Sequence, residues 1–67
     1  MKYSIQVEKE VDGRWIAEIS DLPGVLAYGA TKDEVIAKAE ALALRVVAEK
    51  IEHGETGSDF TISFSTL

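Results

Sequence analysis

The stretch Asp21-Leu22-Pro23-Gly24, followed by Gly29 and by Thr31-Lys32-Asp33-Glu34, decides the fold of this chain. Asp-Leu-Pro-Gly predicts a tight type II turn, because proline presets a φ of about −65° and the next glycine can adopt the positive φ that this turn requires. Thr31 and Glu34 form a capping box, in which Thr31 is the N-cap residue and Glu34 reaches back to the N–H of the cap. A strand, a turn, another strand and a helix are therefore expected in this order.

Upstream of this stretch, residues 2–11 alternate between apolar and polar side chains. This alternation predicts a strand with one buried and one solvated face, the buried face carrying Tyr3, Ile5, Val7 and Val11. Asp12-Gly13 then indicates a hairpin.

The length of the hairpin loop sets the register of the two strands. A two-residue Asp-Gly loop would place Val7 opposite Glu18, whereas a three-residue loop, with Gly13 in the left-handed conformation, places Val7 opposite Ala17 and Ile5 opposite Ile19. A one-residue slip moves every side chain to the other face, so we expect the three-residue loop. Trp15, Ala17 and Ile19 then join the buried face, and Ile16 lies on the outer face beside Glu8.

The next segments predict a short strand over Val25 to Ala30 and a helix from Lys32 to His53, with Gly54 as the residue after the cap. The main apolar stripe of the helix comprises Val35, Ile36, Ala39, Leu42, Ala43, Val46 and Val47. A second stripe lies well round the helix, where one sheet cannot cover it, and predicts an oligomer interface formed by Ala37, Ala41, Leu44, Ala48 and Ile51. Tolerated exposure of alanines is the alternative.

A last strand is predicted around the alternating residues Phe60, Ile62 and Phe64. The chain is then a single α+β domain, residues 1–67, with the element order β-β-β-α-β, which is that of the first half of a ribonuclease H-like fold. A right-handed crossover places the last strand beside the first and parallel to it, giving the sheet order 3-2-1-4. The long helix is expected on one face of this sheet, the face that carries Ile5, Val7, Trp15 and Phe60.

Composition restricts the function further. A chain of 67 residues buries a small core, and it has no cysteine and one histidine, so oligomerisation is the expected source of extra stability. The net charge of −5 argues against nucleic-acid binding and suits a basic protein partner, although acidity can also serve solubility alone. We expect a cytoplasmic protein, because the chain has no cysteine, no apolar signal-peptide region and no run long enough to span a membrane.

The residues that could carry chemistry do not form a convergent set. His53 is expected in the last helical turn, where a cation interacts favourably with the helix dipole, and no nucleophile accompanies it. A two-metal ribonuclease could use Glu8 with Glu34 or Glu40, but the last strand ends in Ser65-Thr66-Leu67 and supplies no carboxylate. The sequence therefore predicts a protein that is not an enzyme and that has no metal site and no cofactor.

The chain resembles the HicB antitoxin family. The resemblance rests on Tyr3, Glu8, Asp12-Gly13, Trp15, Asp21-Leu22-Pro23-Gly24, Gly29, Thr31 and Glu34, and it extends from Tyr3 to Phe64. It implies a degenerate ribonuclease H-like domain that binds a small basic HicA-like toxin, an mRNA-cleaving ribonuclease, and covers its active site. Many family members carry an additional C-terminal DNA-binding domain, and because these 67 residues contain none, direct DNA binding is not expected.

Three functions follow as hypotheses. The first is a stand-alone HicB-like antitoxin, the second a homo-oligomeric binding module with no toxin, and the third a residual metal-dependent ribonuclease. For the first, the outer face and edge of the sheet would bind the toxin, with contacts from Glu8, Glu10, Asp21, Leu22, Pro23, Gly24 and Tyr28. Pro23 and Gly24 are also required by the turn itself.

Overall fold

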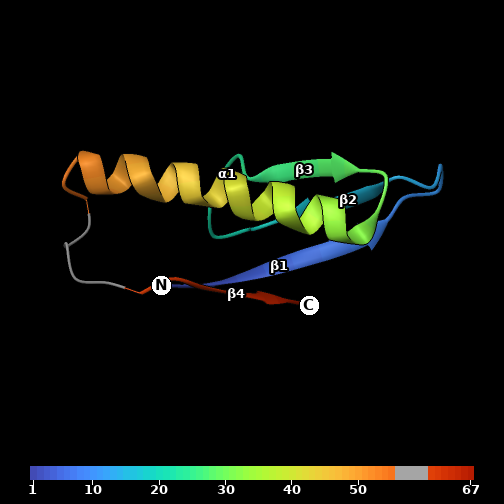
Figure 1. The fold of residues 1–67 in the computed structure, drawn as a ribbon, viewed down its shortest axis with the longest axis horizontal. Coiled ribbons are helices and arrows are strands. Elements are labelled where there is room, and N and C mark those ends of the chain that lie inside the picture. Colours follow the sequence, from blue (N-terminus) through green and yellow to red (C-terminus); the bar gives the residue numbers. More distant parts are fainter. Residues whose placement is uncertain (56–60) are drawn as a thin grey trace.

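In the computed structural model, which describes residues 1–55 and 61–67, one long helix lies on one face of a four-stranded sheet (Figure 1). The elements are β1 (Lys2–Lys9), β2 (Trp15–Glu18), β3 (Leu26–Gly29), α1 (Lys32–Glu52) and β4 (Ser63–Thr66). The sheet order is β3-β2-β1-β4, with β1 and β4 parallel and the other neighbours antiparallel. The predicted α+β topology and strand order are therefore confirmed.

The hairpin between β1 and β2 has the predicted register. The N–H of Glu10 donates to the carbonyl of Arg14 at 2.7 Å, the N–H of Gly13 donates to the carbonyl of Glu10 at 3.0 Å, and Gly13 has a φ of 92°. Val7 faces Ala17, as the three-residue loop requires. The prediction that Val11 is buried is wrong, because the strand ends at Lys9 and Val11 lies fully exposed in the turn.

The Asp21-Leu22-Pro23-Gly24 segment forms the predicted turn. The N–H of Val25 donates to the carbonyl of Leu22 at 3.1 Å, and Gly24 has a φ of 86°, which is the conformation that favours glycine. The N–H of Ile19 donates to the carbonyl of Val25 at 3.1 Å and closes the loop between β2 and β3. β3 then begins at Leu26 rather than at Val25 and ends at Gly29.

Helix α1 begins at the predicted cap with one difference. The side-chain hydroxyl of Thr31 accepts from the N–H of Glu34 at 3.1 Å, as predicted. The Glu34 carboxylate, however, accepts from the N–H of Ala30 at 3.0 Å, one residue before the cap, where the strand β3 has just ended. At the other end the helix stops at Glu52, with His53 as the C-cap.

The core is aliphatic and small. The buried residues of α1 are Val35, Ala39, Ala43 and Val47, which confirms the main apolar stripe as the sheet-facing side. The largest fully buried side chains are Ile5, Ile19, Leu22, Val35 and Val47, and none of them is aromatic.

The aromatic side chains lie at the margin of this core. Tyr3, Trp15 and Phe64 are half-buried and pack against it, together with Val7. Trp15 and Val7 thus lie on the helix-covered face as predicted, whereas Phe60 lies outside the described residues. The last strand is shorter than predicted, because it begins at Ser63, after Ile62.

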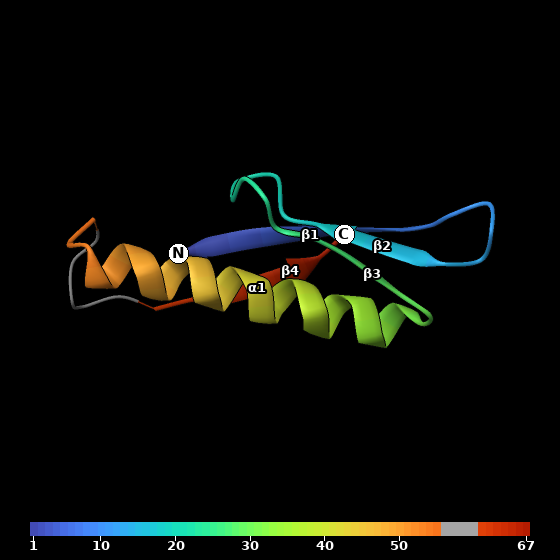
Figure 2. The same cartoon turned by 90° about the horizontal axis from the view of Figure 1, so that it is seen from above.

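The helix lies over one half of the sheet. It packs mainly against β3 and β2 and less against β1, and β4 lies to the far side of β1 (Figures 1 and 2). The close approach of the first helical turn to β3 needs Gly29, where a Cβ would lie 3.3 Å from the backbone nitrogen of Val35. Within residues 1–55 and 61–67, no helix has the length and apolar character needed to cross a membrane.

Candidate functional site

The face of the sheet opposite the helix is uncovered in the described part of the chain. Alternation along β1, β2 and β3 directs eight side chains to this face, of which Lys2 and Ser4 lie at the start of β1. The other six lie side by side on the three strands, and we call them the open sheet face: Gln6, Glu8, Ile16, Glu18, Leu26 and Tyr28. The strand register arranges them in two rows. Glu8, Ile16 and Tyr28 form one row, and Gln6, Glu18 and Leu26 form the other.

The open sheet face combines apolar and acidic groups. Leu26 and Tyr28 are 44% and 42% exposed, and Ile16 beside them is half-buried. Glu8 and Glu18 are exposed at the neighbouring positions of β1 and β2. Exposed aromatic and aliphatic side chains with an acidic border have the composition of a protein-binding surface.

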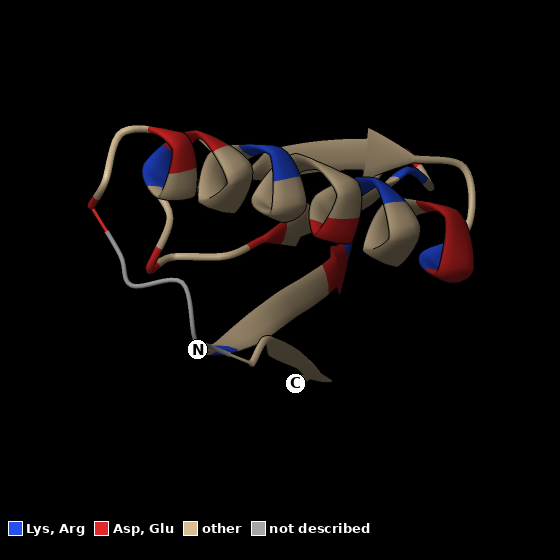
Figure 3. Ribbon diagram, turned by 60° about the vertical axis from the view of Figure 1, so that its left-hand side comes forward, with Lys and Arg blue, Asp and Glu red and all other residues tan. Residues whose placement is uncertain are grey.

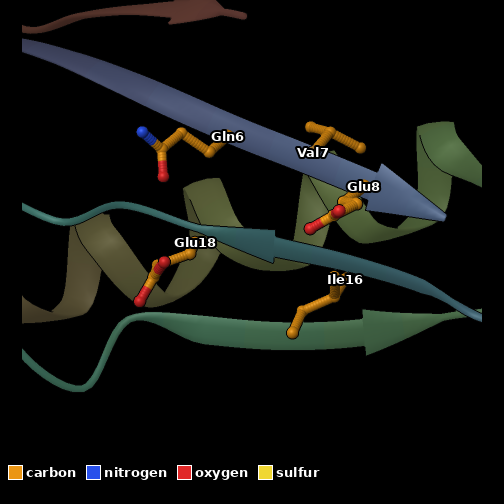
Figure 4. Close-up of a pocket in the computed structure, with 5 residues that line it drawn as sticks. All are labelled: Gln6, Val7, Glu8, Ile16 and Glu18. Atoms are coloured by element: carbon orange, nitrogen blue, oxygen red, sulfur yellow. The ribbon is translucent and has the colours of Figure 1, made fainter. Parts of the chain in front are cut away.

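Between β1 and β2 the open sheet face is hollowed. A shallow hollow of about 400 Å³ is lined by Gln6, Val7, Glu8, Ile16 and Glu18. Figure 4 shows the Gln6 and Glu18 side chains at one end of this hollow and Glu8 with Ile16 at the other, so that carboxylates from two strands border one space. The hollow can accept a side chain of a partner, and its two carboxylates favour a cationic one.

Neither carboxylate of the hollow is neutralised by a salt bridge within the described residues. The salt bridges found there are Asp12–Arg14 at 2.8 Å and Glu34–Lys38 at 3.0 Å. Glu8 and Glu18 take part in neither of them. Their charge is therefore directed to solvent or to a partner.

The Arg14 side chain lies over Tyr28 at one end of the open sheet face. The Arg14 guanidinium carbon lies 4.9 Å from the centre of the Tyr28 ring, a cation–π distance. Asp12 fixes this arginine, because its carboxylate accepts from the Arg14 N–H at 3.0 Å and from Nε at 2.8 Å. The same contacts, the backbone N–H first, lower the pKa of Asp12 below its ordinary value.

The structure distributes the predicted toxin contacts over several places. Glu8 and Tyr28 lie in one row of the open sheet face, and Glu10 is half-buried at the start of the hairpin loop. Asp21, Pro23 and Gly24 are exposed in the loop between β2 and β3.

Leu22 requires a correction. Its side chain is 1% exposed and belongs to the hydrophobic core, so it is not available to a partner. Within the turn, Leu22 is the residue whose side chain is buried, whereas Asp21, Pro23 and Gly24 are exposed. We therefore remove Leu22 from the predicted contact surface.

Sequence reasoning did not assign Ile16, Glu18, Leu26 and Arg14 to the site. A signal for Glu18 was present, because it lies two residues after Ile16 and therefore on the same face of β2. The position of Arg14 over Tyr28 depends on the pairing of β2 with β3, and sequence alone gave no register for that pair.

The second helical stripe is a separate surface. All five of its residues, Ala37, Ala41, Leu44, Ala48 and Ile51, are exposed. Leu44 is 49% exposed and Ile51 is 36% exposed. The stripe is thus accessible, although accessibility does not identify what covers it.

The described part of the chain contains no candidate metal-binding site. Across residues 1–55 and 61–67 there is no group of three or more histidine, cysteine, aspartate or glutamate side chains that could hold a metal ion. Glu8 and Glu34 lie on different elements, β1 and α1, and do not form such a group.

Comparisons with known proteins do not identify the chain. No family model matches it, and neither a curated protein nor a solved structure gives a significant match.

Proposed function

We propose that this protein is a HicB-like antitoxin-type binding protein that acts in the cytoplasm and not as an enzyme. It would neutralise a small basic HicA-like toxin, an mRNA-cleaving ribonuclease, by covering the active site of the toxin. The observation that carries the proposal is the open sheet face, on which exposed Leu26 and Tyr28 lie beside the free carboxylates of Glu8 and Glu18.

In this proposal the net charge speeds association, and the apolar side chains of the open sheet face stabilise the bound state. The net charge of −5 attracts a basic protein over a distance and raises the association rate. Tyr28 and Leu26 then bury apolar surface against the toxin, while Glu8 and Glu18 pair with its arginine or lysine side chains. The resemblance of the sequence to HicB antitoxins supports the choice of this partner over other basic proteins.

The first test is co-expression with an adjacent small basic open reading frame. We expect the neighbour to arrest growth when expressed alone and to be harmless when this protein is present. A neighbour that is harmless alone, or that stays toxic in the presence of this protein, would contradict the proposal.

The second test locates the binding surface. We expect Glu18→Lys to weaken toxin binding at least about tenfold, equivalent to about 1.4 kcal/mol, because a cation then faces the cations of the toxin. Glu49→Lys is the matched control, since it makes the same charge change at an exposed position of α1. Equal effects of the two variants in isothermal titration calorimetry would show that overall charge, and not the open sheet face, governs binding.

The second candidate function is a homo-oligomeric binding module without a toxin partner. The observation that favours it is the exposure of Leu44 and Ile51 on the helical stripe. If this stripe holds copies together, Leu44→Glu lowers the mass that light scattering measures in solution. A mass that does not change in this variant contradicts a role of the stripe in assembly.

A further inference from the structure

The outer edge of β4 carries unpaired backbone groups among the described residues. The N–H of Ser63 donates to the carbonyl of Met1, and the N–H of Leu67 donates to the carbonyl of Ile5, both at 2.9 Å. In a parallel ladder, alternate residues bond to the same neighbouring strand. Phe64 and Thr66 therefore direct their N–H and C=O groups away from β1, to the edge of the sheet where no described strand receives them.

The opposite edge of the sheet is partly protected by a lysine. Lys38 donates from Nζ to the carbonyl of Tyr28 on β3 at 3.1 Å, and the Glu34 carboxylate holds the same ammonium at 3.0 Å. Lysine side chains placed at a sheet edge commonly protect it against pairing with another chain. Among the described residues no side chain bonds to the outward backbone groups of β4 in this way. Ser63-Phe64-Ser65-Thr66 itself contains no charged residue, and Figure 3 shows the strand without acidic or basic segments.

At β4, the face of the sheet that carries the helix is also incompletely covered. Helix α1 packs against β3, β2 and β1, and β4 lies beyond it (Figures 1 and 3). Phe64 on β4 and Tyr3 opposite it on β1 are half-buried, with ring centres 6.1 Å apart. An additional strand beside β4 would continue the sheet past these two rings and bury them further.

We propose that β4 pairs in antiparallel orientation with β4 of a second copy of this chain, around a two-fold axis at Phe64. In this register Phe64 faces the same residue of the second copy, and Thr66 faces Ile62. Phe64 and Thr66 point their backbone groups outward, and Ile62 lies between Thr61 and Ser63, which both bond to Met1. The backbone groups of Ile62 therefore also point outward, and the ladder is completed without shifting the strands. The two Phe64 side chains lie on the helix-covered side of both sheets and form a cross-strand aromatic pair.

Three features favour a second copy over another protein as the occupant. A strand paired antiparallel with itself is self-complementary, which is the requirement of a two-fold interface. Two chains of net charge −5 repel each other, and the charge-free β4 is where they approach at least cost. A core whose fully buried side chains include no aromatic residue gains most from burying Phe64 and Tyr3 at an interface. The contact involves no toxin, so its test is independent of the proposed function.

The test is the substitution Thr66→Pro. Proline has no N–H and is tolerated on an edge strand where that group faces outward, so the bonds of Ser63 and Leu67 to β1 are kept. We expect the wild-type protein to have at least twice the 7.3 kDa mass of one chain in light scattering, and Thr66→Pro to halve the wild-type mass. Thr66→Val is the matched control, because it keeps the backbone donor, and it should leave the mass unchanged.

Two results would overturn the proposal: a monomeric wild-type protein, or a Thr66→Pro variant that is folded by circular dichroism and has the wild-type mass. If Thr66→Pro does not fold, amide hydrogen exchange of the wild-type protein decides. Protection of the Phe64 and Thr66 amides should rise with protein concentration, while that of Leu26 at the opposite edge stays constant. Fast exchange of Phe64 and Thr66 at every concentration would equally refute β4 pairing.

Discussion

The substitution Leu22→Ala separates the structural role of the Asp21-Leu22-Pro23-Gly24 segment from a role in binding. Leu22 is 1% exposed, and replacing a buried leucine by alanine costs about 2–5 kcal/mol, because packing is lost and a cavity remains. Since Leu22 comes from a surface loop that can relax, we expect about 3 kcal/mol. A chain of 67 residues has a total stability of about 3–10 kcal/mol, so this loss is a large fraction of it.

The assay is urea unfolding at one fixed protein concentration, followed by the fluorescence of Trp15, the only tryptophan. A loss of about 3 kcal/mol also lowers the melting temperature by about 12–24 °C for a domain of this size. Pro23→Ala is the control, because Pro23 is exposed and its replacement costs only about 0.4–1 kcal/mol through the unfolded state. Equal losses in the two variants, or a loss below about 1 kcal/mol for Leu22→Ala, would refute the assignment of Leu22 to the core.

Three other predictions concern the two ends of β3, namely the turn before it and the helix cap after it. Gly24→Ala should cost about 1–2 kcal/mol in urea unfolding, entirely from backbone strain, because φ is 86° and an added Cβ meets no atom within 4 Å. Thr31→Ala should cost about 1 kcal/mol through loss of the N-cap, whereas Thr31→Ser should restore most of it. The hydrogen bond from Lys38, and next that from the Ala30 N–H, lowers the pKa of Glu34 below its ordinary value of 4.5. The stability that this shift provides is present above pH 4.5 and is lost as the pH falls through the folded-state pKa. In Glu34→Gln the melting temperature should therefore depend less on pH in this range than in the wild-type protein.

The parts of the fold that sequence predicted are those where a single physical rule dominates. The register of β1 and β2 followed from the cost of exposing a whole apolar face, and the start of α1 followed from the cap at Thr31. Val11 was wrongly assigned to the buried face because the alternating pattern of β1 extends into the turn, beyond the end of the strand at Lys9. Glu34 binds the N–H of Ala30 rather than that of the cap residue, a choice between neighbouring donors that the capping-box pattern does not specify.

The candidate site was predictable only in part. Glu8 and Tyr28 could be assigned to the outer face from alternation along their own strands. The burial of Leu22 depends on the conformation of the loop between β2 and β3, and the stacking of Arg14 on Tyr28 depends on the register in which β2 pairs with β3. Alternation does not extend through a compact loop, so the direction of a loop side chain has no periodic signal.

The bond from Lys38 to the carbonyl of Tyr28 has a consequence for the size of any assembly. Under the proposed pairing, two copies join through identical edges, and both outer ends of the combined sheet are then β3 edges. At each of these ends Lys38 occupies the outward-facing carbonyl of Tyr28, which disfavours the addition of a further strand and therefore growth beyond two chains. A modification that removes this positive charge, such as acetylation of Lys38, would remove that obstacle to strand addition on each copy.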